Sequence, residues 1–289
     1  MYKNRISDFI SYMEEAGVTE IQKLKIGTRE DRVYFTAVFP NNEHVFVKFQ
    51  LDEEGIRKIQ NERVILQALN KKLYRVPKYP DDNYIISEYL EGYVTLKDII
   101  LDNMKNGNKE IIGDYVVHTF EQFIDILAKV SKSDLLLETE DWSRKFRMHF
   151  NKLLMSSGWW GQPNWRLIIR ETIVGYLGFI VALPFKYKLI KPVESITISH
   201  GDFHWGNVMC KNEDVRIIDV ENIMHGDPNM DIAYFYSRLW FYFKNDKELM
   251  NYLDKGLSCF KNSPFYEEKA FNLLLRIFKF LIRCNPKFK

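Results

Sequence analysis

The chain has 289 residues, of which 46% are hydrophobic, so it can bury a sizeable core as one domain or as two closely packed lobes. Its net charge of +2 at pH 7 lacks the basic bias of nucleic-acid-binding proteins, and we expect no nucleic-acid partner. Three separated cysteines argue against a disulfide framework, and the apolar runs are too short to span a bilayer. We therefore predict a cytoplasmic protein with no membrane partner.

The first fifty residues predict a leading helix and an antiparallel β-meander. Apolar side chains recur at helical spacing over residues 4–16, and Gly17 can end that helix. Three β-like runs follow, at residues 21–26, 32–39 and 44–50. Pro40-Asn41-Asn42 supplies the turn between the last two, and the short loops favour antiparallel pairing.

Lys48 lies in the apolar run V-F-V-K-F, where a lysine must either extend to water or find a partner. It is compatible with an edge strand, where a lysine resists aggregation. A partner is available on the periodic helix predicted over residues 54–69, where Glu62 falls near the apolar face. Glu53 and Glu54 are weaker alternatives, because carboxylates at a helix start are already favoured by the helix dipole.

A further strand is predicted over residues 84–89, and a turn at Glu91-Gly92 leads into a mainly helical remainder. In that remainder, residues 114–131 carry an apolar stripe typical of a buried helix face.

Three tryptophans, Trp159, Trp160 and Trp165, surround a Gly-Pro turn within seven residues. They are compatible with a cap on a hydrophobic core. They are also compatible with a stacking platform, because indole rings pack against sugars and attract quaternary ammonium groups.

The polar stretch at residues 198–233 carries the clearest chemical pattern. It contains H-G-D-x-x-x-x-N, with Asp202 and Asn207, followed by an apolar β pair that ends at Asp219. Phosphoryl transfer requires a carboxylate that orients the attacking hydroxyl, and oxygen ligands for magnesium. Asp202 suits the first role, while Asn207 and Asp219 suit the second.

Protein kinases have an Asp and an Asn at the same offset, but they carry Arg where this chain has Gly201. They also carry Phe and Gly where Val220 and Glu221 follow the second aspartate. The pattern, with I-D-x-E and G-D-P-x-x-D-I-A, instead resembles the aminoglycoside phosphotransferase and choline kinase superfamily.

This resemblance implies an α+β, bilobal protein-kinase-like fold with an antiparallel-sheet N-lobe that binds nucleotide and a mainly helical C-lobe that binds the acceptor. It implies phosphotransfer from ATP or GTP, with Mg2+, to a hydroxyl of a small molecule. The acceptor classes that we consider are a sugar, an amino alcohol, a nucleoside and an aminoglycoside-like compound. The alternative is a catalytically silent pseudokinase or interaction protein.

The resemblance also implies roles for N-lobe residues. Lys48 would hold the nucleotide phosphates and Glu62 would steady it. The loop with Gly27 and Thr28 would cover the phosphates, although its single glycine suits an ordinary hairpin equally well. The hinge that binds adenine through its backbone would be formed by Glu88, Tyr89 and Leu90. The boundary between the two lobes would then lie at residue 91, with an N-lobe over 1–91 and a C-lobe over 92–289.

Several neighbours of the motif have open roles. Glu221 is compatible with a metal site or with orienting a loop, while His200 is expected to brace the loop by hydrogen bonds. Asp227 and Asp231 are typical of loop and helix-start residues that tie the segment down, and Asp231 precedes an apolar helix and can cap it. A metal hydrolase based on His200, His204 and His225 is disfavoured, because these residues lack the usual ligand spacing.

The C-terminal end bears on the acceptor's charge. The last fourteen residues contain no acid and five basic residues, namely Arg276, Lys279, Arg283, Lys287 and Lys289. Polycationic acceptors need surplus carboxylates. Acids at Glu138, Glu140 and Asp141 can meet one positive charge, so we predict a neutral or singly charged acceptor.

Overall fold

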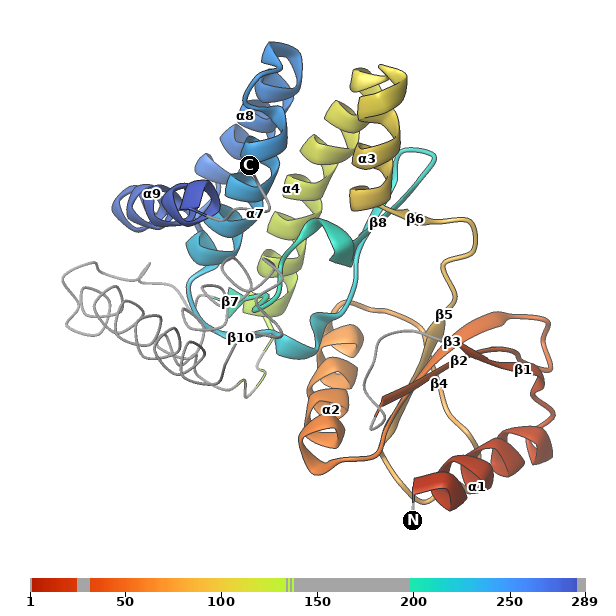
Figure 1. Cartoon of the computed structure of the whole chain (residues 1–289). Helices are drawn as coiled ribbons and strands as arrows, with labels where there is room; N and C mark the ends of the chain where they lie inside the picture. The colour runs from red at the N-terminus through yellow and green to blue at the C-terminus, as the bar shows by residue number, and fades with distance from the viewer. Residues whose placement is uncertain (1, 25–31, 134, 136, 138–197, 285–289) are drawn as a thin grey trace, which may run out of the picture. The chain divides into compact units, whose positions relative to one another are not determined.

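The computed structural model describes residues 2–24, 32–133, 135, 137 and 198–284 (Figure 1). The chain divides into two compact units. The first unit consists of Met1–Tyr93 together with the short segment Asp219–Ile223, and the second of Val94–Ile218 and Met224–Lys289.

The first unit is built on a five-stranded antiparallel sheet with strand order β1-β2-β3-β5-β4. Its strands are β1 (Thr19–Leu24), β2 (Arg32–Val38), β3 (His44–Gln50), β4 (Leu73–Tyr74) and β5 (Tyr84–Glu88). Its helices are α1 (Tyr2–Glu15) and α2 (Glu53–Ala68), and the returning segment forms the short 3-10 helix η2 (Val220–Asn222).

Side-chain alternation along β3 separates the two faces of this sheet. Val45, Val47 and Phe49 are fully buried on one face, where the ring of Phe9 from α1 lies 4.7 Å from that of Phe49. Lys48 has the opposite parity and therefore points to the other face. The apolar pattern of β3 thus places one buried lysine on the face away from the α1 core.

The second unit combines helices with short strand pairs. Its helices are α3 (Leu96–Asn106), α4 (Lys109–Ser131), η1 (Trp205–Asn207), α7 (Pro228–Phe243), α8 (Lys247–Lys261) and α9 (Glu268–Cys284). Its strands are β6 (Val94–Thr95), β7 (Ile198–Ser199), β8 (Val208–Lys211), β9 (Asp214–Ile217) and β10 (Met224–His225). Strand β8 pairs with β6 and β9, and β7 pairs with β10.

Aromatic packing fixes the polar stretch to the helical core of the second unit. The Phe203 ring is fully buried, 4.3 Å from Phe123 of α4 and 4.6 Å from Phe235 of α7. Because one side chain of the loop is held between two helices, the neighbouring polar residues have a rigid support.

Most predicted elements are present with ends shifted by a few residues. The leading helix, the meander and the helix after β3 agree with prediction, and the predicted β pair after Asn207 is β8 and β9. Two-residue strands such as β4 and β6 were not predicted, because such short segments carry no periodic signal. Among the described residues, no helix combines the length and the apolar character needed to cross a bilayer.

Candidate functional site

Residues 199–207, here called the Asp202 loop, are fixed by a buried carboxylate in the first turn of α7. The side chain of Asp231 accepts hydrogen bonds from Ser199 Oγ at 2.8 Å, from His200 N–H at 2.6 Å and from Gly201 N–H at 3.3 Å. Gly201 has a φ of +82°, a conformation that glycine adopts without steric cost. The loop backbone is therefore fixed by the side chain of Asp231.

Within this loop, short-range bonds orient Asp202 and Asn207. The amide nitrogen of Asn207 donates to the carbonyl of Asp202 at 3.0 Å, which leaves its amide oxygen as a potential ligand. His200 Nδ1 accepts from Asp202 N–H at 3.4 Å, so the predicted bracing by His200 is confirmed. His204 Nε2 lies 3.7 Å from Asp202 Oδ1. The Asp202 side chain is 19% exposed and thus accessible to solvent.

Of the two roles expected for Asp231, the structure shows that it ties this segment down and that it does not cap α7. Asp227 is the N-cap and accepts from Asn229 N–H at 2.8 Å, and Pro228 occupies the first turn. Proline is favoured there because its missing N–H would have no partner in the helix. Asp231 lies one turn further along, where its carboxylate bonds the Asp202 loop instead of the helix end.

The first unit contains a charged cluster formed by Arg32, Lys48, Glu62, Asp219 and Glu221. Lys48 Nζ lies 2.8 Å from Glu62 Oε2 and 3.0 Å from Asp219 Oδ1, and it also donates to Glu221 Oε2. The ion pair between Lys48 and Glu62 that the helix pattern predicts is present. One lysine on β3 thereby joins α2 to the segment that carries Asp219.

Burial and charge act in opposite directions in this cluster. Burial alone would lower the pKa of Lys48, but the carboxylates of Glu62, Asp219 and Glu221 outweigh it and raise that pKa. Burial raises the pKa of Glu62, and the positive charge of Lys48 opposes the change. Lys48 consequently stays protonated, and its positive charge favours the ionised form of Glu62 against the effect of burial.

The segment Asp219–Ile223 is attached to α2 by its backbone. The amide nitrogen of Asn61 donates to the carbonyl of Glu221 at 2.9 Å and to that of Ile223 at 3.0 Å. Asp219 adopts the left-handed conformation, with φ 60°, which aspartate tolerates better than most residues. Its side chain makes no cap bond to η2 and points to Lys48 instead.

The acidic residues of the cluster suit a divalent cation chemically. Carboxylate oxygens of Glu62, Asp219 and Glu221 lie within 4.8 Å of one another, and magnesium prefers oxygen ligands. The side chains of Glu62 and Glu221 are only 10% and 3% exposed, whereas that of Asp219 is 28% exposed. Asp219 is therefore the accessible ligand of the three.

The predicted hinge lies where β5 ends. Glu88 is the last residue of β5, and the N–H of Tyr89 donates to the His44 carbonyl at 3.2 Å. This bond commits the Tyr89 amide to the sheet edge, while the Leu90 carbonyl accepts from Tyr93 N–H at 3.2 Å. Gly27 and Thr28, the three clustered tryptophans and the acids at 138–141 lie outside the described residues.

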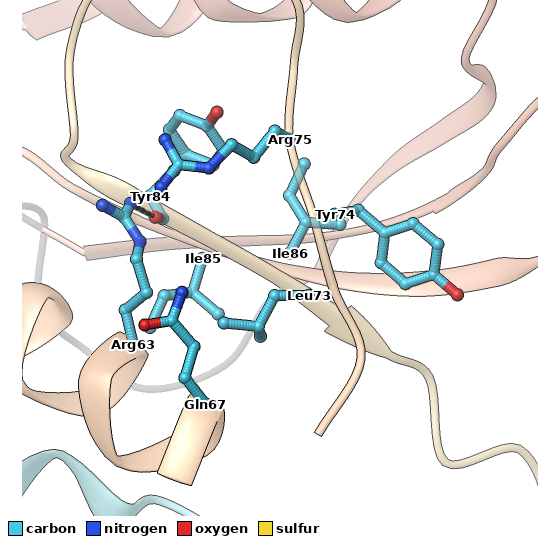
Figure 2. A pocket seen from close by; sticks show the side chains of 8 residues that line it. All are labelled: Arg63, Gln67, Leu73, Tyr74, Arg75, Tyr84, Ile85 and Ile86. Atoms are coloured by element: carbon cyan, nitrogen blue, oxygen red, sulfur yellow. Dashed lines mark hydrogen bonds between the residues drawn. The ribbon is translucent and has the colours of Figure 1, made fainter. Parts of the chain in front are cut away.

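A separate hollow in the first unit is lined by none of the predicted site residues (Figure 2). It lies between α2, β4 and β5 and has a volume of about 90 Å³. Sites for drug-sized ligands measure roughly 300–1,000 Å³, so this hollow is too small for a nucleotide. Arg63 at its edge is already bonded to the Tyr84 carbonyl at 2.6 Å.

The structure brings Lys48, Glu62 and Asp219 together in the first unit, and Asp202 with Asn207 in the second. Sequence reasoning missed Arg32, although a signal for it exists. A hairpin centred on Asn41 pairs Lys48 with Tyr34, and Arg32 shares the face of Tyr34 because it lies two residues away.

Comparisons with known proteins identify the family and the fold of the chain. A model of the phosphotransferase enzyme family matches residues 20–261 of the chain. No curated protein matches it by sequence.

Solved structures resemble the chain over most of its length. A choline kinase from Cryptosporidium parvum Iowa II is 14% identical with a TM-score of 0.58, and the match covers 93% of this chain and 81% of that one. The choline kinase LicA from Streptococcus pneumoniae is 15% identical with a TM-score of 0.56, covering 98% and 89%. The amicoumacin kinase hAmiN is 11% identical with a TM-score of 0.60, covering 97% and 86%. The predicted α+β protein-kinase-like fold is thus confirmed.

Proposed function

The chain belongs to the phosphotransferase enzyme family and is a small-molecule kinase, and from that premise we propose that it transfers the γ-phosphate of ATP or GTP to an acceptor hydroxyl. The observation that carries this proposal is the Asp202 loop, in which Asp231 bonds the backbone of His200 next to the solvent-accessible carboxylate of Asp202, and Asn207 bonds the Asp202 carbonyl. Such a preorganised carboxylate is what positioning of a hydroxyl nucleophile requires.

Asp202 has the central role in this proposal. It accepts a hydrogen bond from the acceptor hydroxyl and takes its proton as the hydroxyl oxygen bonds to the γ-phosphorus. The bond from that phosphorus to the β,γ-bridging oxygen breaks, and the nucleoside diphosphate leaves with the electron pair. The partial exposure of the Asp202 side chain, 19%, supports access by an acceptor.

Lys48 holds the nucleotide phosphates, and Glu62 keeps its ammonium group in place. Asn207 and Asp219 would bind Mg2+, which neutralises phosphate charge when bound. The accessible carboxylate of Asp219 and the amide oxygen of Asn207 support this assignment, because both are hard oxygen ligands.

In this proposal, each of the two lobes binds one of the two substrates. The lobe over 1–91 binds the nucleotide, with Gly27 and Thr28 over the phosphates and the chain at 88–90 along the base. The lobe over 92–289 binds the acceptor. The exposed end of β5 at Glu88 and Tyr89 supports the base site.

For the acceptor, we favour a neutral or singly charged metabolite over a polycation. Two cations of α9 are held against one indole ring of the second unit: Lys279 Nζ lies 4.7 Å and Arg283 Cζ 5.1 Å from the Trp240 centroid. Such fixed positive charges repel a polycationic compound.

The test is magnesium-dependent turnover of nucleotide with a panel of choline, ethanolamine, sugars, nucleosides, homoserine and aminoglycosides. Asp202→Ala should retain nucleotide binding but lose about 100-fold to 10,000-fold in rate, as expected for loss of a general base. Asp219→Ala should also lose the magnesium dependence of nucleotide binding.

A wild-type protein that binds nucleotide, yet transfers phosphate to no acceptor faster than Asp202→Ala, would identify the silent nucleotide-binding alternative instead. Efficient turnover confined to aminoglycosides would overturn the acceptor preference while leaving the reaction class intact.

A further inference from the structure

Glu221 is shared between two cations of the sheet. Its Oε1 lies 3.2 Å from Arg32 Nη2, and its Oε2 accepts from Lys48 Nζ. The strand register explains this convergence: Tyr34 pairs with Lys48 across β2 and β3, and Arg32 is two residues from Tyr34 on the same face. The side chain of Glu221 is 3% exposed, so both of its partners bind it away from water.

Lys48 is the cation that all three carboxylates of the cluster share. Two cations, Arg32 and Lys48, face three carboxylates, so the cluster as a whole is one charge negative. A lysine that turns towards nucleotide phosphates must release at least one carboxylate. Glu62 and Glu221 are both buried, and a buried carboxylate without a partner is strongly unfavourable.

Arg32 offers a way to avoid that cost at Glu221. Because the guanidinium group binds the other carboxylate oxygen, Glu221 keeps a cationic partner when the Lys48 ammonium moves away. Arginine suits this position, since it stays charged and forms fixed, directional hydrogen bonds. Its other terminal nitrogen, Nη1, donates to Tyr34 Oη at 3.4 Å, which limits the freedom of the head group.

We propose that Arg32 is a positioning residue for nucleotide binding, which holds the charge of Glu221 so that Lys48 is available to the phosphates. This rests on the proposed function, in which Lys48 binds the nucleotide. It assigns Glu221 to orienting the lysine, through Arg32, and it gives β2 a part in the nucleotide site.

If Arg32 had a purely structural role, the loss caused by replacing it would not be reversed by a second change that restores the charge balance of the cluster. The backbone of the Glu221 segment is already tied to α2 by Asn61, which bonds the carbonyls of Glu221 and Ile223. The hydrogen bond from Arg32 to that segment is made to the side chain of Glu221, and the carboxylate of Asp219 adds to the attraction. The contribution of Arg32 is therefore electrostatic. The nucleotide affinity that is lost when Arg32 is replaced should be recovered when the negative charge of Glu221 is removed as well.

The experiment measures binding of a fluorescent ATP analogue, with and without magnesium, at a temperature where all variants are folded. Arg32→Gln should raise the dissociation constant by about tenfold or more, because Glu221 then retains Lys48. The double variant Arg32→Gln with Glu221→Gln should bind close to the wild-type level, since the net charge of the cluster is again one negative. Arg32→Lys should recover part of the loss.

Arg75→Gln is the matched control, because its side chain is 68% exposed and lies outside the cluster. Thermal unfolding of every variant reports stability separately from affinity. A double variant as weak as Arg32→Gln, or an Arg32→Gln variant with unchanged affinity, would overturn the inference. If the wild type itself binds no nucleotide, the proposed function fails instead, so the two failures are distinguishable.

Discussion

The Asp202 loop and the charged cluster hold their carboxylates by different means. In the loop, Asp202 and Asn207 are five residues apart and are oriented by a direct bond between them, and a buried aspartate fixes the backbone. In the cluster, Lys48 and its carboxylate partners come from β3, α2 and the segment after β9, up to 173 residues apart.

The difference has an energetic consequence. The loop depends on charge-assisted hydrogen bonds from backbone N–H groups to one carboxylate, which are stronger than hydrogen bonds between neutral groups. The cluster depends on buried ion pairs, in which the desolvation of each charge is offset only while its partner is present. The loop should therefore tolerate changes in the cluster, whereas the cluster should be sensitive to any change in its charge.

The largest expected effect comes from removing the cation at the centre of the cluster. Lys48→Met should lower the free energy of unfolding by about 3–5 kcal/mol, because the buried carboxylates of Glu62 and Glu221 lose a partner. It should also abolish measurable nucleotide binding. Chemical denaturation and binding of the fluorescent ATP analogue measure these two effects.

Lys72→Met is the control, because the Lys72 side chain is 59% exposed in the same unit. Equal stability of the Lys48→Met and Lys72→Met variants would show that the buried ion pairs do not stabilise the fold, and the contrast between loop and cluster would be lost.

A somewhat smaller effect is expected when the loop loses its anchor. Asp231→Asn replaces an acceptor-only carboxylate by an amide, which leaves part of the N–H donors of His200 and Gly201 without a good partner. We expect a loss of about 3 kcal/mol in the free energy of unfolding. We also expect a loss of about 100-fold in kcat as Asp202 shifts.

Nucleotide affinity should be nearly unchanged in Asp231→Asn, in contrast to Lys48→Met. The informative measurement is therefore a comparison of kcat with nucleotide affinity in the same variant. Asp125→Asn on the exposed face of α4 is the control. A comparable loss of nucleotide affinity would mean that loop and cluster are not independent.

The smallest effect is a pH dependence that separates the two regions. Burial raises the pKa of Glu62 and Lys48 opposes it, so in Lys48→Met that pKa should rise further. The folded variant then binds a proton more tightly than its unfolded chain, and its stability increases as the pH falls towards the range of Glu62.

The stability gap between wild type and Lys48→Met should accordingly narrow by about 1 kcal/mol between about pH 8 and about pH 5. Lys48 in the wild type stays charged across this range, because its raised pKa lies above its ordinary value. Denaturation curves at several pH values test this, and a gap that widens towards low pH would contradict it. No such narrowing is expected for Asp125→Asn.

The sequence by itself determined the local parts of this protein. The period of the apolar residues gave α1, α2 and the meander, because burial on one face imposes that period directly. The spacing from Asp202 to Asn207 was sufficient to predict the loop, since a five-residue offset is closed by a single local bond. The pairing of Lys48 with Glu62 was also predicted, because a lysine in an apolar run either extends to water or finds a partner, and Glu62 falls near the apolar face of the following helix.

Only the tertiary structure decided which polar and charged groups, distant in the sequence, bind one another. Arg32, Asn61 and Glu221 meet because the segment after β9 returns to the first unit, and no local pattern in the sequence encodes that return. Asp227 and Asp231 were both expected to tie their segment down, but only the structure shows that Asp227 caps the helix and that Asp231 anchors the Asp202 loop. Local rules depend on neighbouring residues, whereas the partners of buried charges depend on which segments pack together, and packing is a property of the whole fold.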